Sequence, residues 1–302
     1  MLKVLFLLLF TGHYINQVKS QDKILFIGHA YGDPNKRDQK LDPSLIKYLS
    51  GIEKTKIIYG GDFIQECNDS TEVSNFKKIN SKNDLILIPG NHDLNCENFN
   101  HKLNRKEVFN ENIFFYLNTN FSSKEKIKEA IDFISNSLND NSFKNILIFS
   151  HQFISSKSDW DLKTNSRDFY SFANIFYDQL EQMLLNKSQK VFIYSGDIGA
   201  FSFSPYAYFD TKNNLEFISA GLGNGYNNKI VEITLKGNSV ENRFIDLDTK
   251  QVESKENYKR WKVKFYQFPK IFAKQLIDKI EIILYCFLFL AILIFWRSKN
   301  KS

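Results

Sequence analysis

Cysteine, internal repeats and net charge are all scarce in this chain of 302 residues. It holds 3 Cys, and its bias toward Lys, Asn, Ile and Phe runs evenly along the sequence, so no repeat architecture and no separate low-complexity domain is indicated. The formal net charge is +6, of which the first twenty residues contribute +2 and the last six +3, leaving +1 for residues 21–296. A neutral centre gives no argument for nucleic-acid binding. With 43% hydrophobic residues the chain can bury a full core, and its length suits one large domain.

Acidic residues are absent from the first twenty positions, which have the pattern of a secretory signal peptide. Lys3 precedes an apolar run over residues 4–10, and Val18 and Ser20 supply small residues at the spacing that a signal peptidase reads. We therefore expect residues 1–20 to be a signal peptide that is cleaved near Ser20. An uncleaved anchor is the alternative, but the apolar run is short for one.

A long apolar run without charge lies near the other end of the chain. Fifteen uncharged residues, IILYCFLFLAILIFW, occupy positions 282–296. As a helix they measure about 22 Å, so a span of the bilayer would also recruit residues from 277 onward, with Lys279 and Glu281 reaching toward the interface. Trp296 and the basic tail 297–302 follow, which is typical of the cytoplasmic end of a membrane anchor. A lipid-anchor signal is the alternative, and the basic tail fits it less well.

Together the two ends predict a single-pass membrane protein whose main domain lies on the extracytoplasmic side, periplasmic or extracellular. Lysines also precede the apolar run, so the orientation rests on the signal peptide rather than on charge. The expected segments are a signal peptide (1–20), the main domain (21–250), a juxtamembrane segment (251–276), a transmembrane helix (277–296) and a cytoplasmic tail (297–302).

Short apolar runs alternate with helical patterns through the first two-thirds of the chain, which predicts an α/β fold. The strands are expected at 23–28, 56–60, 85–89, 145–150 and 191–195, and the helices at 43–49, 71–79, 123–138 and 168–185. After Gly199 the pattern contains strands alone, at 215–221, 229–235 and 241–247. We therefore expect an α/β core completed by an antiparallel layer.

Polar side chains of metal-binding types follow each of the first five strands. They are His29, Tyr31 and Asp33 after the first, Asp62 after the second, Asn91, His92 and Asp93 after the third, His151 after the fourth and Asp197 after the fifth. Because strands of an α/β sheet deliver their following loops to one crevice, these side chains are expected to meet there. Carboxylates, an amide oxygen and imidazoles suit divalent Zn, Mn or Fe, and a pair of such ions can clamp a phosphoryl group.

The order of these motifs resembles the calcineurin-like metallophosphoesterase family over about residues 23–247. The resemblance is carried by GGDF at 60–63 and PGNHD at 89–93, followed by a strand-end histidine and a final glycine-centred loop. It implies a four-layer β-sandwich flanked by helices. It also implies one or two divalent metal ions, Mn, Fe or Zn, as cofactors and a phosphate ester as substrate.

The resemblance also implies roles for individual residues. Asp62 is expected to bridge two metal ions, and Asn91 and His151 to bind the second ion. His92 is expected to protonate the leaving group without binding metal, while Asp93 holds its imidazole in one tautomer.

Two motifs depart from the family pattern. Where the family has Asp-x-His after the first strand, this chain has His29 and Tyr31, and where the family has Gly-His-x-His, it has Asp197 followed by Gly199. The second metal site thus keeps its ligands with Asp197 as an oxygen donor, whereas the first keeps Asp62 and His29, with Tyr31 or Asp33 as further candidates. One site is expected to be intact and the other altered or lost.

Three functions compete on these residues. The first is a membrane-anchored, metal-dependent phosphoesterase that hydrolyses a phosphate mono- or diester with metal-activated water. The second is a degenerate family member that binds a phosphorylated ligand or partner without turnover. The third is a metal hydrolase of another bond. Retention of His92 and Asp93 favours an enzyme, because a binding protein has little need of a positioned proton donor.

The cysteines allow one structural prediction. Cys286 lies in the predicted span, whereas Cys67 and Cys96 lie in the extracytoplasmic domain, each five residues after a predicted metal ligand. Their loops leave strands expected to be neighbours, so we predict a disulfide between them; two buried free thiols are the alternative.

Overall fold

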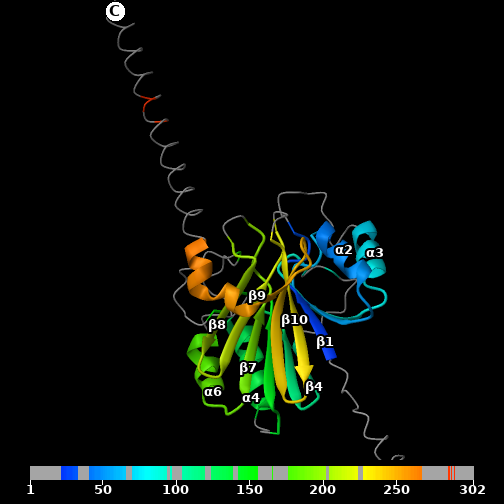
Figure 1. The fold of residues 1–302 in the computed structure, drawn as a ribbon. Coiled ribbons are helices and arrows are strands. Elements are labelled where there is room, and N and C mark those ends of the chain that lie inside the picture. The colour runs from blue at the N-terminus through cyan, green and yellow to red at the C-terminus, as the bar shows by residue number, and fades with distance from the viewer. Residues whose placement is uncertain are drawn as a thin grey trace, which may run out of the picture.

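The computed structural model describes most of the region between the two chain ends (Figure 1). The described residues are 22–32, 41–65, 70–93, 96, 104–119, 124–138, 142–155, 165, 176–201, 204–223, 227–266, 285, 287 and 289.

Two six-stranded mixed sheets form the body of the protein. Sheet A has the order β12 (Val252–Ser254), β11 (Ser239–Asp246), β10 (Lys229–Lys236), β1 (Asp22–Ile27), β2 (Lys56–Gly60), β3 (Asp84–Ile88). Sheet B has the order β4 (Asn104–Phe109), β5 (Asn112–Leu117), β6 (Asn145–Ser150), β7 (Lys190–Ser195), β9 (Leu215–Ala220), β8 (Ala207–Lys212). Part of each sheet is parallel: β1, β2 and β3 in sheet A, and β5, β6, β7 and β9 in sheet B. Parallel neighbours bring their carboxyl ends to the same edge of the sheet, which is where the polar loops emerge.

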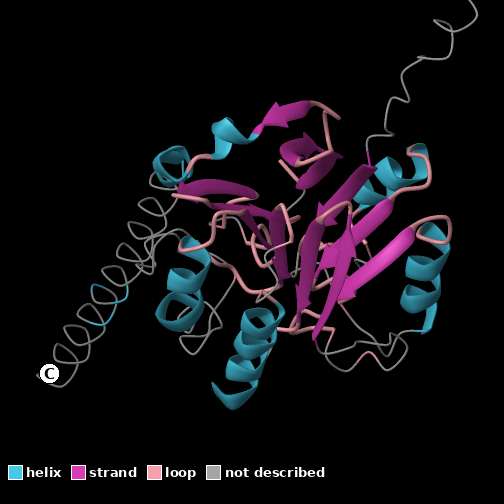
Figure 2. Ribbon diagram, turned by 90° about the horizontal axis from the view of Figure 1, so that it is seen from below, coloured by secondary structure: helices cyan, strands magenta, loops and turns pink. Residues whose placement is uncertain are grey.

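Helices cover the outer face of each sheet (Figures 1 and 2). Sheet A is covered by α2 (Pro43–Gly51) and α3 (Ser70–Ile79), and sheet B by α4 (Lys124–Ser137), the π-helical turn η1 (Phe176–Leu180) and α6 (Glu181–Leu185). The sequence explains these positions, because α2 begins at the N-cap Asp42 followed by Pro43 and turns Leu45 and Leu49 inward. α4 places Ile127, Ile131 and Ile134 on one buried face, as the spacing predicted.

The inner faces of the two sheets pack against each other through an aromatic layer. The rings of Phe149 and Tyr194, on neighbouring strands, stack with centroids 4.5 Å apart, and Phe114 stacks on the other side of Phe149 at 6.1 Å. Each such pair contributes roughly 0.5–1.5 kcal/mol beyond its buried area. The Tyr194 hydroxyl donates a hydrogen bond to Asn242 Oδ1 in sheet A at 2.8 Å, so the layer also fixes one sheet relative to the other.

The expectation of a separate antiparallel layer after Gly199 is wrong. The late strands divide between the two sheets: β10 pairs antiparallel with β1, whereas β9 pairs parallel with β7. Local patterns mark these segments as strands, but the pairing of β10 with β1 joins residues about 200 positions apart, which no local pattern encodes. The predicted α/β class holds, with helices and two mixed sheets.

The predicted membrane segments fall mostly outside the described residues. Residues 1–20 lie outside them entirely, and of residues 277–296 only Tyr285, Phe287 and Phe289 are described, all helical and exposed. Among the described residues, no helix is both long and apolar enough to cross a membrane.

One half of the predicted disulfide can be placed. Cys96 is 2% exposed, lies in the cluster that packs sheet A against α2 and α3, and is disulfide-bonded. Strands β2 and β3 are neighbours, as the prediction required. Cys67 lies outside the described residues.

Candidate metal centre

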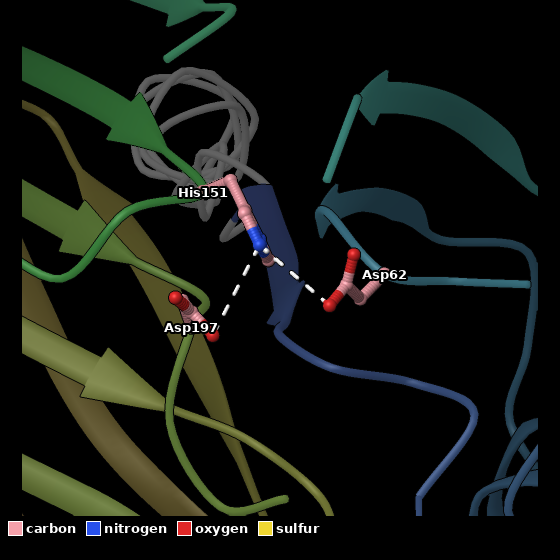
Figure 3. Close-up of side chains that lie close together, drawn as sticks. All are labelled: Asp62, His151 and Asp197. Carbon is pink, nitrogen blue, oxygen red and sulfur yellow. Dashed lines mark ion pairs between the residues drawn. The ribbon is translucent and has the colours of Figure 1, made fainter. Parts of the chain in front are cut away.

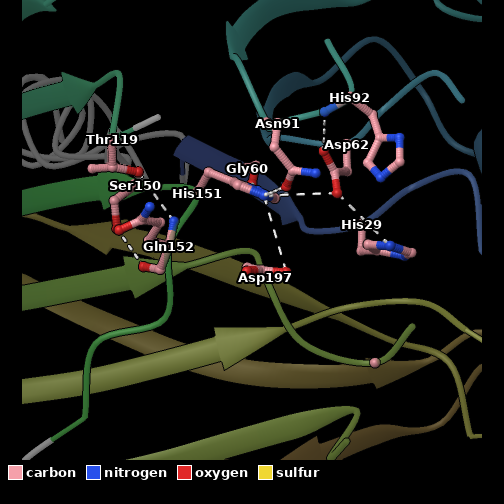
Figure 4. Close-up of polar contacts among 12 residues, drawn as sticks. His29, Gly60, Asp62, Asn91, His92, Thr119, Ser150, His151, Gln152 and Asp197 are labelled. Carbon is pink, nitrogen blue, oxygen red and sulfur yellow. Dashed lines mark hydrogen bonds and ion pairs between the residues drawn. The ribbon is translucent and has the colours of Figure 1, made fainter. Parts of the chain in front are cut away.

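Loops from both sheets meet at the carboxyl ends of the parallel strands. Sheet A supplies His29 after β1, Asp62 after β2 and Asn91 after β3, while sheet B supplies His151 after β6 and Asp197 after β7. Figure 4 shows these five side chains grouped around one point. The site therefore lies between two sheets, not at the crevice of a single open sheet as the sequence pattern suggested.

Asp62, His151 and Asp197 form the tightest group of metal-binding side chains among the described residues (Figure 3). His151 Nε2 lies 3.7 Å from Asp62 Oδ2 and 4.0 Å from Asp197 Oδ1. All three side chains are buried, with exposed fractions of 2% for Asp62, 1% for His151 and 6% for Asp197. Two atoms bound to one ion at roughly 2.0–2.2 Å are at most about 4.4 Å apart, so these separations suit a shared ion.

Backbone carbonyls fix the orientation of both buried imidazoles. His151 Nδ1 lies 2.9 Å from the carbonyl oxygen of Gly60, and His29 Nδ1 lies 3.1 Å from that of Leu222. Because a carbonyl can only accept, each Nδ1 carries the hydrogen. In the neutral imidazole the lone pair is then on Nε2, which in each ring is the atom nearer to the Asp62 carboxylate.

His29 approaches Asp62 from the opposite side to His151. Its Nε2 lies 3.8 Å from Asp62 Oδ2, the same oxygen that faces His151. His29 is 2% exposed and has φ of 45°, and Asp62 has φ of 53°. Both residues thus adopt the left-handed backbone conformation, which is costly for non-glycine residues and concentrates at functional sites.

The electrostatic environments of the two histidines differ. Burial lowers the pKa of His29, and the attraction of Asp62 and Asp197 does not reverse this. Burial also lowers the pKa of His151, but the nearby Asp62 and Asp197 carboxylates outweigh it, so the pKa is raised overall. The net shifts therefore have opposite directions, and the carboxylates of Asp62, Asp197 and Asp93 are the charges that raise the pKa of His151.

Asn91 and His92 sit at the exposed rim of the centre. Asn91 Oδ1 lies 3.1 Å from His151 Nε2, which places the amide oxygen beside the carboxylates. The backbone N–H of His92 donates to Asp62 Oδ1 at 3.1 Å. The exposed imidazole of His92 packs edge-on against the Tyr31 ring, with centroids 5.4 Å apart. A molecule arriving from solvent thus meets these two side chains first.

The buried Asp93 connects the loop after β2, which carries Asp62, with the loop after β3, which carries Asn91. It is fully buried, and its carboxylate accepts hydrogen bonds from the backbone N–H groups of Asp62 (2.6 Å), Gly90 (2.8 Å) and Ile64 (3.3 Å). Burial, and secondarily the Asp62 carboxylate, raises the pKa of Asp93 to about 7. The sequence assigned Asp93 to the imidazole of His92, which stays a prediction; the contacts show in addition that its carboxylate holds the loop that carries Asp62.

Two glycines allow the loops to approach this closely. A Cβ on Gly61 would lie 2.3 Å from His151 Nδ1, and φ at Gly61 is +87°. A Cβ on Gly90 would lie 2.1 Å from Asp62 Oδ1. Real side chains do not tolerate such contacts, so the glycines of the GGDF and PGNHD motifs are required by packing around Asp62 and His151.

Tyr31 occupies the place at which the family pattern has a histidine. It is 1% exposed, and its ring lies 4.3 Å from that of His29, between His29 and His92. Burial, followed by the negative charge of Asp62, raises the pKa of Tyr31. A buried neutral phenol is a poor metal donor, so this side of Asp62 has one imidazole where the family pattern has more ligands. Asp33, the other candidate there, lies outside the described residues.

Several residues that position the site were not identified from the sequence. The carbonyl of Leu222 belongs to the glycine-rich loop after β9, which was expected as a strand end without a site role. Thr119 Oγ1 accepts from the backbone N–H of Gln152 at 3.1 Å, and Ser150 Oγ donates to the carbonyl of Gln152 at 3.2 Å, so both hold the turn that follows His151 (Figure 4). The glycine-rich sequence GLGNG was the available signal for the loop that contains Leu222. The carbonyl itself could not be predicted, because a backbone carbonyl leaves no side-chain signature.

The donor set fits a divalent metal ion. Oxygen atoms of Asp62, Asn91 and Asp197 converge with the Nε2 atoms of the two histidines. With neutral imidazoles whose hydrogens are on Nδ1, all of these atoms are acceptors. Buried acceptors that face one another need a positive charge between them. A mixed oxygen and imidazole set is typical of Mn, Fe and Zn sites.

Comparison with known proteins agrees with this reading of the site. The family model described as calcineurin-like phosphoesterase matches residues 23–169. No curated protein matches the chain.

Three solved structures show weak likeness. A predicted phosphoesterase from Streptococcus pneumoniae is 9% identical with a TM-score of 0.36, and the match covers 77% of this chain and 93% of that one. A single mutant of Vps29 from Entamoeba histolytica is 12% identical with a TM-score of 0.32, covering 74% and 98%. Wild-type Vps29 from the same organism, in complex with zinc, is 12% identical with a TM-score of 0.29, covering 74% and 99%. Scores this low carry no argument about function.

The family match spans the loops of His29, Asp62, Asn91 and His151, whose side chains the structure brings to one point. Residues 23–169, just under half of the chain, thus match the calcineurin-like phosphoesterase family that the sequence motifs resemble.

Proposed function

We propose that the protein is a metal-dependent hydrolase of phosphate mono- or diesters. The observation that carries the proposal is the convergence of Asp62, His151 and Asp197, with Nδ1 of His151 committed to the Gly60 carbonyl so that Nε2 is left for a cation. A divalent ion bound there, Mn, Fe or Zn, would activate water and neutralise negative charge on the phosphoryl oxygens. This group would hold one ion. His29 Nε2, together with Asp62, could contribute to binding a second ion.

The chain's own residues would divide the remaining work. Asn91 and Asp197 complete the oxygen donors beside His151, and the buried Asp93 keeps the Asp62 loop in register with the Asn91 loop. His92 is exposed at the rim, and its N–H bond to Asp62 holds it next to the centre. There it can donate a proton to the departing oxygen of the ester, a role worth about 10²–10⁴ in rate.

A family member that binds a phosphorylated ligand without turnover is the second candidate. The observation that favours it is Tyr31, a buried phenol where the family pattern has an imidazole. A centre with one ion instead of two would stabilise the transferring phosphoryl group less well.

We also propose that the domain is extracytoplasmic and held at a membrane. This rests on the sequence of the chain ends, namely the signal-peptide pattern of residues 1–20 and the apolar run at 282–296 with its basic tail. The domain 21–250 would then work close to a bilayer on the periplasmic or extracellular side.

The decisive experiment is metal removal and replacement on the full chain purified in detergent. We expect chelator-treated protein to be inactive toward an aryl phosphate and a bis-aryl phosphodiester, and one of Mn²⁺, Fe²⁺ or Zn²⁺ to restore turnover. His151→Ala should not be restored. Binding of inorganic phosphate in the presence of metal, without turnover of either ester, would select the binding protein. Turnover that survives chelation would contradict the proposed centre.

A further inference from the structure

Aromatic side chains gather on a short helical segment that follows the catalytic domain. This segment, residues 260–266, continues from the 3₁₀ turn η2 (Lys255–Tyr258). Its exposed fractions are 65% for Trp261, 72% for Phe265 and 70% for Tyr266, high values for such large apolar side chains. Trp261 and Phe265 are four residues apart and therefore project from the same face of the helix. We call Trp261, Phe265 and Tyr266 the aromatic face.

The segment is fixed to the domain by its other side. Val263 is 6% exposed and belongs to the buried cluster that includes Phe153 and Ile198. Its backbone N–H donates to the carbonyl of Lys259, and Lys259 forms a bridge with Phe209 in β8. The aromatic face is therefore held outward by packing and is not the loose end of the domain.

Lysines border the aromatic face. Residues 259–266 contain three lysines and one arginine and no acidic residue. Lys259 pairs with Glu256 and Arg260 is buried, so Lys262 and Lys264 are the cations beside the rings. Lys262 Nζ lies 5.6 Å from the centroid of the Trp261 ring, and Lys264 lies between Val263 and Phe265 in the sequence. Exposed aromatic rings bordered by lysines are the composition that binds the interface of a bilayer, where the rings enter the headgroup layer and the lysines meet anionic lipids.

The position of the segment in the chain indicates what the aromatic face contacts. Ten residues separate Tyr266 from the proposed span at 277–296, and even fully extended they reach only about 36 Å. We propose that the aromatic face binds the surface of the membrane in which the chain is anchored, preferring anionic lipids. The geometry of this proposal rests on the proposed anchor, but it does not depend on phosphoesterase activity.

The contact would restrict how the metal centre faces the membrane. Val263 shares its buried cluster with Phe153, two residues after His151, and with Ile198, one residue after Asp197. A bilayer contact at Trp261 would thus be joined through packed side chains to the part of sheet B that carries two of the donors, instead of leaving the domain to swing on a linker.

Tryptophan fluorescence in vesicles tests the proposal on the full chain. The chain has 3 Trp, so Trp160→Phe together with Trp296→Phe leaves Trp261 as the only reporter. The protein is reconstituted in phosphatidylcholine and phosphatidylserine vesicles, with or without bromine on the acyl chains near the headgroup. Bromine should quench Trp261. The matched control replaces all three tryptophans by Phe and adds Val108→Trp, because Val108 is 56% exposed on β4, at the opposite edge of sheet B from β8.

The outcomes separate this inference from the anchor. A third variant that retains only Trp296 reports the proposed span, so quenching of Trp296 without quenching of Trp261 beyond the Val108→Trp control would overturn the aromatic-face contact alone. Loss of quenching at Trp296 would overturn the anchor. Blue-shifted Trp261 emission without bromine quenching would mean that protein, for example a second copy, covers the face, and would also overturn the inference.

The lysines give a second readout. Lys262→Gln and Lys264→Gln should each weaken the contact by about fivefold in anionic vesicles, and by less when phosphatidylserine is omitted. Equal quenching of Trp261 in both variants and in both lipids would contradict the role of charge and with it the preference for anionic lipid.

Discussion

The two sides of Asp62 differ in chemistry although they are similar in geometry. On one side His151 Nε2 lies 3.7 Å from Asp62 Oδ2, and on the other His29 Nε2 lies 3.8 Å from the same atom. Each imidazole donates its Nδ1 hydrogen to a backbone carbonyl. The His151 side adds oxygen atoms of Asn91 and Asp197, whereas the His29 side adds the ring of Tyr31.

This difference separates metal binding from substrate chemistry. The His151 side offers four donors, counting Asp62, and their convergence makes it the side that suits a cation. The His29 side offers one imidazole whose pKa burial lowers, and next to it the exposed His92. We infer that the first ion binds on the His151 side, while the His29 side faces the substrate or holds a second, weaker ion.

The sharpest way to separate the two sides is His92→Ala. Because His92 is at the exposed rim and contributes only its backbone N–H to Asp62, its imidazole should be dispensable for metal. We expect turnover of the preferred ester to fall by about 10²–10⁴ while bound metal, measured by elemental analysis, stays the same. Loss of metal from this variant would show that His92 is a ligand and that the division is wrong.

A paired comparison of His151→Ala with His29→Ala follows. Residues that only orient ligands change metal affinity by about 10–100-fold, so removal of a true ligand should reach or exceed the upper value. We therefore expect affinity in calorimetric titration to fall by about 100-fold or more for His151→Ala and by about tenfold for His29→Ala. Equal losses of metal affinity in the two variants would mean that His151 and His29 contribute equally to one shared ion.

Much of this arrangement was predictable because strand-end loops are local features. Runs such as KIIYG and LILIP are followed by GD and GNHD, and each predicted strand appears within two residues of its expected bounds. Their polar residues meet because parallel strands share an edge, a rule that needs no knowledge of distant pairing. The family match agrees with the same motifs.

The features that were not predicted depend on long-range pairing or on the backbone. The β4–β5 hairpin went unrecognised because β4 reads NRKEVF, without a clear apolar alternation, and its turn uses Asn110 and Glu111 at positive φ instead of a glycine. The joining of two sheets at one site, and the Leu222 carbonyl that orients His29, follow from β9 pairing with β7.

Asp93 gives a test of the support beneath both sides. Its carboxylate accepts backbone hydrogen bonds from the Asp62 and Asn91 loops, and Asp93→Asn replaces one acceptor oxygen by a donor. We expect the free energy of unfolding of the metal-free protein to fall by about 1–3 kcal/mol, the cost of an unsatisfied buried group. Denaturant titration measures it, with Asp84→Asn, an exposed carboxylate at the start of β3, as the matched control, expected within about 0.5 kcal/mol of wild type. A fall no larger than that of the control would show that the loops do not depend on Asp93.

The smallest expected effect is a change of metal preference in Asp197→His. Asp197 Oδ1 lies 4.0 Å from His151 Nε2, and this residue stands where the family pattern has a histidine, so the variant exchanges an oxygen donor for an imidazole on the His151 side. Imidazole favours Zn²⁺ over Mn²⁺ relative to a carboxylate, and the removal of one negative charge lowers the overall attraction for any divalent ion. We expect the ratio of Zn²⁺ to Mn²⁺ affinity to rise by roughly tenfold, about 1.4 kcal/mol, in competition titrations monitored by elemental analysis. Asp210→His, on β8, is the control, because a histidine placed elsewhere in sheet B should leave the ratio unchanged. An unchanged ratio in Asp197→His would remove Asp197 from the donor set and leave the His151 side with three donors, which would make the two sides of Asp62 more alike than the structure indicates.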